Sequence, residues 1–236
     1  MAGIYGFISG IISRIILYRG DNKIVTKFCR LCDIAFRYYL WIYSRYNAKF
    51  CSPGRVYKIP LGFKMWLPSW GSWTVAARRY GLWEPWTTKT LDSIVKPGMS
   101  VIELGACYGY FTLLLSKLTG PKGKVYSFEP CPKYFQILKR NVELNGVENV
   151  ILYNKAVSDT VSKVSFDAEA THPYASLGQI SGLDYSGYGN AYIQKKVEIE
   201  CVSLSKFLKE KNIQMDILFM DIEGCEIKVI RDIKEL

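Results

Sequence analysis

From Lys96 onward, short apolar runs alternate with segments whose apolar residues recur with a helical period. Short runs of this kind are typical of buried strands, and the helical period is typical of amphipathic helices. This alternation predicts an α/β domain, in which helices cover both faces of a parallel sheet. The predicted strands are Ser100–Leu104, Lys124–Phe128, Val150–Asn154, Lys196–Val202 and Asp216–Met220, and the predicted helices are Tyr110–Leu118, Pro132–Asn145 and Ser203–Lys211.

Residues 158–195 interrupt this rhythm, because they are rich in Gly, Ser and Tyr. We expect a hairpin and a loop there. Ahead of the sheet, residues 51–75 carry short β-prone runs broken by Pro and Gly, which indicates a small hairpin or extended arm. Residues 76–95 have a helical pattern, with Pro85 as a local break.

The first part of the chain has a different pattern. Residues 4–16 form one apolar helical stripe, and a second helical stretch, rich in Phe, Tyr and Trp, covers about residues 25–46. The first stripe is too short to span a bilayer. Two interpretations stay open: these helices lie in a membrane interface, or they pack on the domain. The predicted organisation is a basic helical segment at 1–50, an arm and lead-in helix at 51–95, and the α/β domain at 96–236.

Charge separates these parts. Residues 1–90 hold 14 Lys/Arg against 3 Asp/Glu, so the whole net charge of +10 comes from the region ahead of the sheet. A basic, aromatic segment suits an anionic membrane surface, a nucleic acid or an acidic substrate. A solvated basic face is the plainer alternative.

The seven cysteines are an odd number and are scattered along the chain. Cys29 and Cys32 have zinc-like spacing, but no second such pair accompanies them, so we predict no metal site. We therefore expect reduced thiols in a cytoplasmic protein. The alternative to a purely cytoplasmic location is peripheral attachment to the inner face of the membrane through residues 1–50.

The strongest chemical signal is the segment Glu103-Leu-Gly105-Ala106-Cys107-Tyr108-Gly109. A buried strand runs directly into a glycine-bearing turn that opens a helix, where backbone N–H groups can approach a ligand. The acid before the first glycine would repel a pyrophosphate and attract a cation. The G-x-G-x-x-G pattern of dinucleotide folds is missing. This turn is therefore predicted to bind a cationic ligand.

Two further acids stand at the ends of later strands. Glu129, in Phe128-Glu129-Pro130, can accept both hydroxyls of a ribose, because a carboxylate takes two donors side by side. Asp221, in Asp221-Ile-Glu223-Gly-Cys-Glu226, ends an apolar strand at the edge where open α/β sheets bind ligands. Such acids could orient an acceptor or act as a base. For Glu226, stabilisation of a helix start is an equal alternative.

Taken in order, these motifs resemble the FkbM family of methyltransferases. Further segments carry the resemblance from about Trp83 to Glu226: Trp83-Glu84-Pro85, Asn141-Val-Glu-Leu-Asn145-Gly146 and Ala156-Val-Ser-Asp159. Three positions depart from the family pattern. Glu103 replaces Asp, Cys107 replaces Asn, and Phe219 stands where the family often has Lys. The resemblance implies a Rossmann-like sheet wider than the roughly four core strands predicted here, so we expect that sheet to be incomplete at its C-terminal side.

The resemblance also implies S-adenosylmethionine as cofactor and O-methylation of a sugar or other small molecule. The predicted cofactor-binding residues are Glu103, Gly105, Ala106, Gly109, Glu129, Pro130 and Ala156. On the acceptor side we predict Asp221 first and Glu223 second. His172 is a candidate base because it is the only histidine.

Two other functions remain as alternatives. The first is a catalytically weak or inactive module of the same fold, held at a membrane by residues 1–50. The second is nucleic-acid methylation, which the basic N-terminal region suggests. The acidic character of the Asp221 segment disfavours a phosphate-rich acceptor. The sequence carries no signal about oligomeric state.

Overall fold

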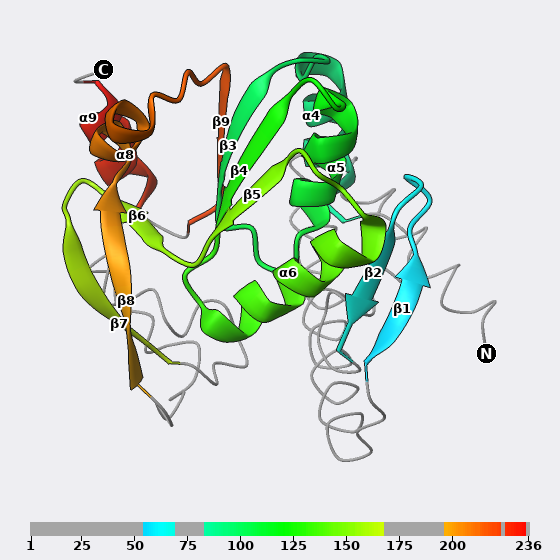
Figure 1. Cartoon of the computed structure of the whole chain (residues 1–236), viewed down its shortest axis with the longest axis horizontal. Coiled ribbons are helices and arrows are strands. Elements are labelled where there is room, and N and C mark those ends of the chain that lie inside the picture. Colours follow the sequence, from blue (N-terminus) through cyan, green and yellow to red (C-terminus); the bar gives the residue numbers. More distant parts are fainter. Residues whose placement is uncertain (1–53, 69–82, 168–195, 223–224, 235–236) are drawn as a thin grey trace, which may run out of the picture. The chain divides into compact units, whose positions relative to one another are not determined.

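The computed structural model describes residues 54–68, 83–167, 196–222 and 225–234 (Figure 1). The predicted N-terminal helices, His172 and Glu223 lie outside these residues. The chain divides into two units, and every element discussed below belongs to the unit that contains Arg55–Leu67 and Ala76–Leu236. Within the described part of the chain, no helix is long and apolar enough to cross a membrane.

The central sheet has four parallel strands in the order β5-β4-β3-β9. Helix α5 connects β3 to β4, and α6 connects β4 to β5, because neighbouring parallel strands need a crossover connection. The predicted α/β, Rossmann-like class is therefore confirmed. The strands are β3 (Ser100–Leu104), β4 (Lys124–Phe128), β5 (Val150–Tyr153) and β9 (Ile217–Met220), and the helices are α5 (Tyr110–Thr119) and α6 (Pro132–Asn145).

Strand β3 lies at the centre of the core and is buried on both sides. Ile102 and Leu104 pack with Phe128 and residues of α8 (Leu204–Lys211) and α9 (Glu226–Ile233). Glu103 points the other way, toward α5, because successive side chains alternate across a strand. A strand buried on both faces has to be almost wholly apolar. The acid at position 103 is therefore the exception that needs a functional explanation.

A second sheet has three strands, which lie side by side in the order β6-β8-β7. Strand β8 (Lys196–Ser203) matches the predicted strand, and it pairs antiparallel with β7 (Ser162–Asp167), at the start of the segment expected to hold a hairpin. Residues 168–195 of that segment lie outside the described residues, so the hairpin stays a prediction. Strand β6 (Ala156–Ser158) was not predicted. Three residues are too few to show a periodic pattern, so only the pairing with β8 defines this strand.

Two other predictions need correction. Pro85 does not interrupt a helix: it is the first residue of α4 (Pro85–Ile94). Proline suits that position, because its missing N–H would have no partner in the first turn. Helix α9 was also not predicted, and its first residue is Glu226. The predicted small hairpin is confirmed as β1 (Arg55–Lys58) and β2 (Lys64–Leu67).

Asp232 joins α9 to the start of α8 and should be important for stability. Its buried carboxylate accepts hydrogen bonds from the Ser203 and Ser205 hydroxyls, both at 2.8 Å, and from the Ser205 N–H at 2.9 Å. In Asp232→Ala these three donors lose their acceptor. We expect the free energy of unfolding in urea to fall by about 1–3 kcal/mol. The exposed Asp92→Ala is the control, with a change within about 0.5 kcal/mol. Equal effects of the two substitutions would contradict the prediction.

Candidate functional site

The turn after β3 is held tightly against the neighbouring strands. The N–H groups of Gly105 and Ala106 donate to the Phe128 carbonyl at 2.9 and 3.0 Å, and the Asp221 N–H donates to the Leu104 carbonyl at 3.0 Å. Gly105 has a φ of +88°, and a Cβ built there would lie 2.1 Å from the Asp221 carbonyl oxygen. Only glycine allows this approach. The structure thus brings Gly105, Phe128 and Asp221 together at the carboxyl edge of the sheet.

Glu103 is 1% exposed, and one of its carboxylate oxygens carries all the side-chain hydrogen bonds it makes. Oε2 accepts from the Thr112 and Ser127 hydroxyls at 2.5 Å each. Oε1 has no partner among the described residues. Burial raises the pKa of Glu103 to about 7, and the bonds from Ser127 and Thr112 oppose that rise. A buried acid with an unpaired oxygen beside a glycine turn fits a cationic ligand.

Phe219 helps to explain the surroundings of Glu103. The two residues are paired in register on β9 and β3, so their side chains lie on the same face of the sheet. The Phe219 ring packs edge-on against Phe111 of α5, with ring centroids 5.0 Å apart. An aromatic ring therefore stands next to the acid, where the family pattern often has a lysine. An apolar neighbour adds to the desolvation of the carboxylate.

Glu129 connects the first two motifs. Its Oε2 accepts from the Cys107 N–H and its Oε1 from the Cys131 N–H, both at 2.8 Å. Burial raises the pKa of Glu129 to about 7; the two backbone N–H groups lower it, and the nearby Glu103 adds to the rise. Each carboxylate oxygen has a second lone pair, so both can still accept a ligand hydroxyl. The predicted ribose contact is compatible with this geometry and stays a prediction.

Three predicted cofactor residues line one small pocket of about 30 Å³. Ligand pockets measure about 300–1,000 Å³, so this pocket marks where the predicted residues converge rather than the space of a whole ligand. A larger pocket of about 610 Å³ lies at the opposite edge of the sheet, and no predicted site residue lines it. The small pocket is lined by Leu104, Gly105, Phe128, Pro130, Lys155, Ala156, Val157, Ile222 and Cys225.

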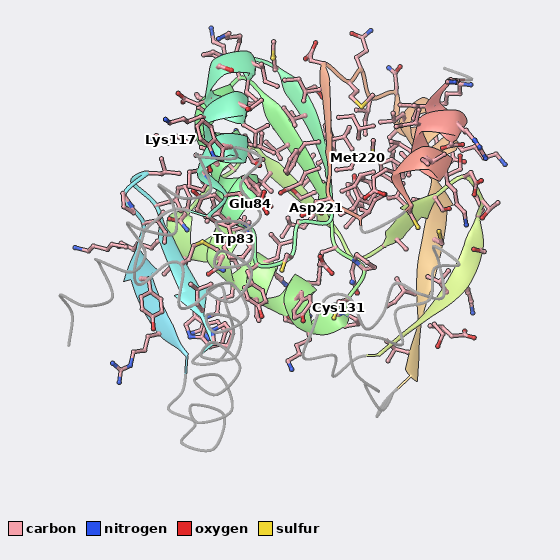
Figure 2. The ribbon with its side chains drawn as sticks, turned by 180° about the vertical axis from the view of Figure 1, so that it is seen from behind. Trp83, Glu84, Lys117, Cys131, Met220 and Asp221 are labelled. Carbon is pink, nitrogen blue, oxygen red and sulfur yellow. The ribbon has the colours of Figure 1, made fainter. Side chains whose placement is uncertain are left out.

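Asp221 is exposed at the end of β9, and Glu84 lies near it (Figure 2). Partial desolvation, then Glu84, then Glu226 raise the pKa of Asp221 above its usual value. Glu226 also accepts the Ile222 N–H at 3.2 Å, so it has a structural role at the start of α9. That role supports the alternative interpretation of Glu226. Of the other predicted acceptor-side residues, Glu223 and His172 lie outside the described residues.

Glu84 is a site residue that the sequence analysis did not single out. It precedes α4 and has a left-handed backbone conformation, with φ +40° and ψ +74°, which is uncommon for a residue other than glycine. The Thr87 hydroxyl donates to its Oε2 at 2.9 Å. The only sequence signal was its place in Trp83-Glu84-Pro85. Among the described residues no set of His, Cys, Asp and Glu is arranged to hold a metal ion.

Known proteins match parts of this chain. It is 48% identical over 54 residues to a protein-L-isoaspartate O-methyltransferase of Thermotoga maritima, covering 23% of this chain and 17% of that protein. It is 26% identical over 146 residues to Methyltransferase 1 of Beauveria bassiana, covering 57% and 58% of the two chains. A solved structure of a protein-L-isoaspartate O-methyltransferase is matched with a TM-score of 0.28 and 39% identity, over 30% of this chain and 23% of that one.

The chain thus spans less than two thirds of each of these relatives. The sequence profile of the methyltransferase FkbM domain, however, matches residues 103–236, which is more than half of the chain and contains the Glu103, Glu129 and Asp221 segments. On that match, this chain belongs to the FkbM family of methyltransferases.

Proposed function

We propose that this chain transfers a methyl group from S-adenosylmethionine to a hydroxyl of a sugar or another small molecule. One observation carries the proposal: the backbone of Asp221, whose side chain is exposed, lies directly against the glycine turn, since its carbonyl touches the Gly105 position and its N–H bonds to the Leu104 carbonyl. A base next to a donor-binding turn is the arrangement that methylation of a hydroxyl requires.

Each predicted residue has a chemical task in this proposal. S-adenosylmethionine, the cofactor of this fold, supplies an electrophilic methyl on a sulfonium. Glu103 and the turn from Gly105 through Ala106 to Gly109 hold the cationic end, and Glu129 accepts the ribose hydroxyls. Pro130 and Ala156 line the space for the adenine ring of the cofactor. These assignments agree with the unpaired oxygen of Glu103 and with the small pocket.

Asp221 is the proposed base. Its carboxylate would accept the proton of the acceptor hydroxyl, whose oxygen would take the methyl group that the bound cofactor supplies. The raised pKa of Asp221 favours this task, because a stronger base removes the proton more readily. Glu223 and His172 remain the second and third acceptor-side candidates.

The acceptor class follows from charge. Glu84, Asp221 and Glu226 place negative charge around the acceptor side, which would repel a phosphate-rich nucleic acid. Neutral hydroxyl compounds, such as sugars, carry no such penalty. Peripheral membrane contact through residues 1–50 belongs to the same proposal as an accessory function, and co-sedimentation with anionic liposomes at rising salt tests it.

Two measurements test the enzymatic proposal. Isothermal titration with S-adenosylhomocysteine should show binding, and no binding by intact, folded protein would sink the idea. With radiolabelled S-adenosylmethionine and a panel of sugars and small alcohols, Asp221→Asn should lower methyl transfer about 10²-fold or more. The same variant should keep its affinity for S-adenosylhomocysteine, as should the control Asp92→Asn, which is exposed on α4 and lines neither pocket. The rate of the native chain should fall as pH drops through the raised pKa of Asp221.

A further inference from the structure

The outer edge of strand β2 is paired by side chains of helix α6 instead of by another strand. Asn145 accepts the Lys64 N–H at 2.8 Å and donates to the Lys64 carbonyl at 2.7 Å. Asn141 accepts the Trp66 N–H at 2.6 Å and donates to the Trp66 carbonyl at 3.2 Å. Each side-chain amide thus offers one donor and one acceptor, as a peptide group of a neighbouring strand would.

The spacing of the two elements makes this pairing possible. Residues four apart on a helix are separated by roughly 6 Å along its axis, and residues two apart on a strand by roughly 7 Å. Asn141 and Asn145 can therefore meet Lys64 and Trp66 together. Figure 1 shows β2 beside α6, in agreement with these bonds. The hairpin lies outside residues 103–236, the range that the family profile matches.

Asn141 has a further bond that Asn145 lacks. Its Nδ2 donates to the carbonyl of Tyr108 at 2.8 Å, within the glycine turn, and its side chain is fully buried. The third bond of Asn145 goes instead to the Asn141 carbonyl, within the helix. One buried amide therefore holds both the hairpin edge and the turn.

The same part of α6 supports the turn through packing. Leu138 lies so close to Gly109 that a Cβ built on that glycine would come within 2.6 Å of it. Leu138 also belongs to an apolar cluster with Ala106 and Val142. Asn141, on the same helix, is the polar contact of this support, and it fixes the direction of the Tyr108 carbonyl.

We propose that Asn141 is a positioning residue for the cofactor turn, and that it couples the β1–β2 hairpin to cofactor binding. The inference rests on the proposed binding of S-adenosylmethionine at this turn. Coupling is reciprocal: a docked hairpin orders the turn for the cofactor, and a bound cofactor holds the hairpin on α6. Asn145 stabilises the hairpin alone.

The pair Asn141→Ala and Asn145→Ala provides a matched test in the full chain. Both variants lose two hydrogen bonds to the hairpin, so both should melt at a lower temperature. Titration with S-adenosylhomocysteine should give a Kd about tenfold higher for Asn141→Ala and within about twofold of the native value for Asn145→Ala. Asn141→Asp, which keeps the size of the side chain but sets an acceptor against the Trp66 and Tyr108 carbonyls, should behave like Asn141→Ala.

Hydrogen exchange distinguishes coupling between the hairpin and the cofactor from a purely structural role of Asn141. In the native chain and in Asn145→Ala, S-adenosylhomocysteine should slow exchange of the Trp66 N–H, and in Asn141→Asp it should not. Equal loss of affinity in the two alanine variants, or exchange at Trp66 that ignores the ligand in the native chain, would overturn the coupling alone. If the native chain failed to bind S-adenosylhomocysteine at all, the proposed function would fall together with it.

Discussion

Gly105→Ala is expected to abolish binding of S-adenosylhomocysteine and to destabilise the domain. The added Cβ would lie 2.1 Å from the Asp221 carbonyl oxygen, which is backbone and cannot rotate away. The left-handed conformation at φ +88° adds about 1–2 kcal/mol for any side chain. Displacing the Asp221 backbone adds about 1–3 kcal/mol more. Titration calorimetry and urea unfolding measure the two effects.

Gly98→Ala separates the steric part from the conformational part. Gly98 has nearly the same φ, +89°, but a Cβ there would have no atom within 4 Å. This control should lose only the conformational part, about 1–2 kcal/mol, and should bind S-adenosylhomocysteine normally. If Gly105→Ala were no less stable than Gly98→Ala and bound the ligand equally well, the close approach between the turn and Asp221 would be wrong.

Glu129→Ala is expected to weaken binding of S-adenosylhomocysteine about 100-fold. Hydrogen bonds to a charged group contribute about 1.5–3 kcal/mol each. The predicted ribose contact has two such bonds, and the substitution would remove both. The substitution also removes the acceptor of the Cys107 and Cys131 N–H groups, so the turn would lose its link to α6. Glu143→Ala, an exposed glutamate on the same helix, should leave the affinity unchanged. Calorimetric Kd values of the two variants decide the matter.

The pKa of Glu129 gives this prediction a pH signature. Because burial raises the pKa of Glu129 to about 7 from its ordinary value of 4.5, the folded chain holds a proton between these pH values that the unfolded chain releases. The contribution of Glu129 to stability is therefore complete below about pH 4.5 and declines as pH rises toward 7. Affinity for S-adenosylhomocysteine should increase over the upper part of that range, as the ionised carboxylate becomes available to the ribose hydroxyls. Glu129→Ala should lack both trends.

Local patterns predicted the elements that depend on local signals. Strands Ser100–Leu104 and Lys124–Phe128 have the predicted bounds, since each is a short, mostly apolar run between turn residues. Helix Pro132–Asn145 also matches, because proline suits its first turn and Gly146 follows its end. Strand β6 was missed because its three residues carry no period. The position of Pro85 was misjudged because proline is allowed at a helix start as well as at a break.

By itself, the sequence determined where acids stand beside strand ends and a glycine turn: one acid before the turn, one after the second strand and one after β9. Residue type and order sufficed for that, because strand ends, glycine turns and carboxylates are local features. Only the tertiary structure decided how they meet. It placed Gly105 against the Asp221 backbone, set both oxygens of Glu129 on Cys107 and Cys131, left one oxygen of Glu103 unpaired, and joined Asn141 to Tyr108 and Trp66. These contacts link residues far apart in the chain, and packing alone brings such residues together.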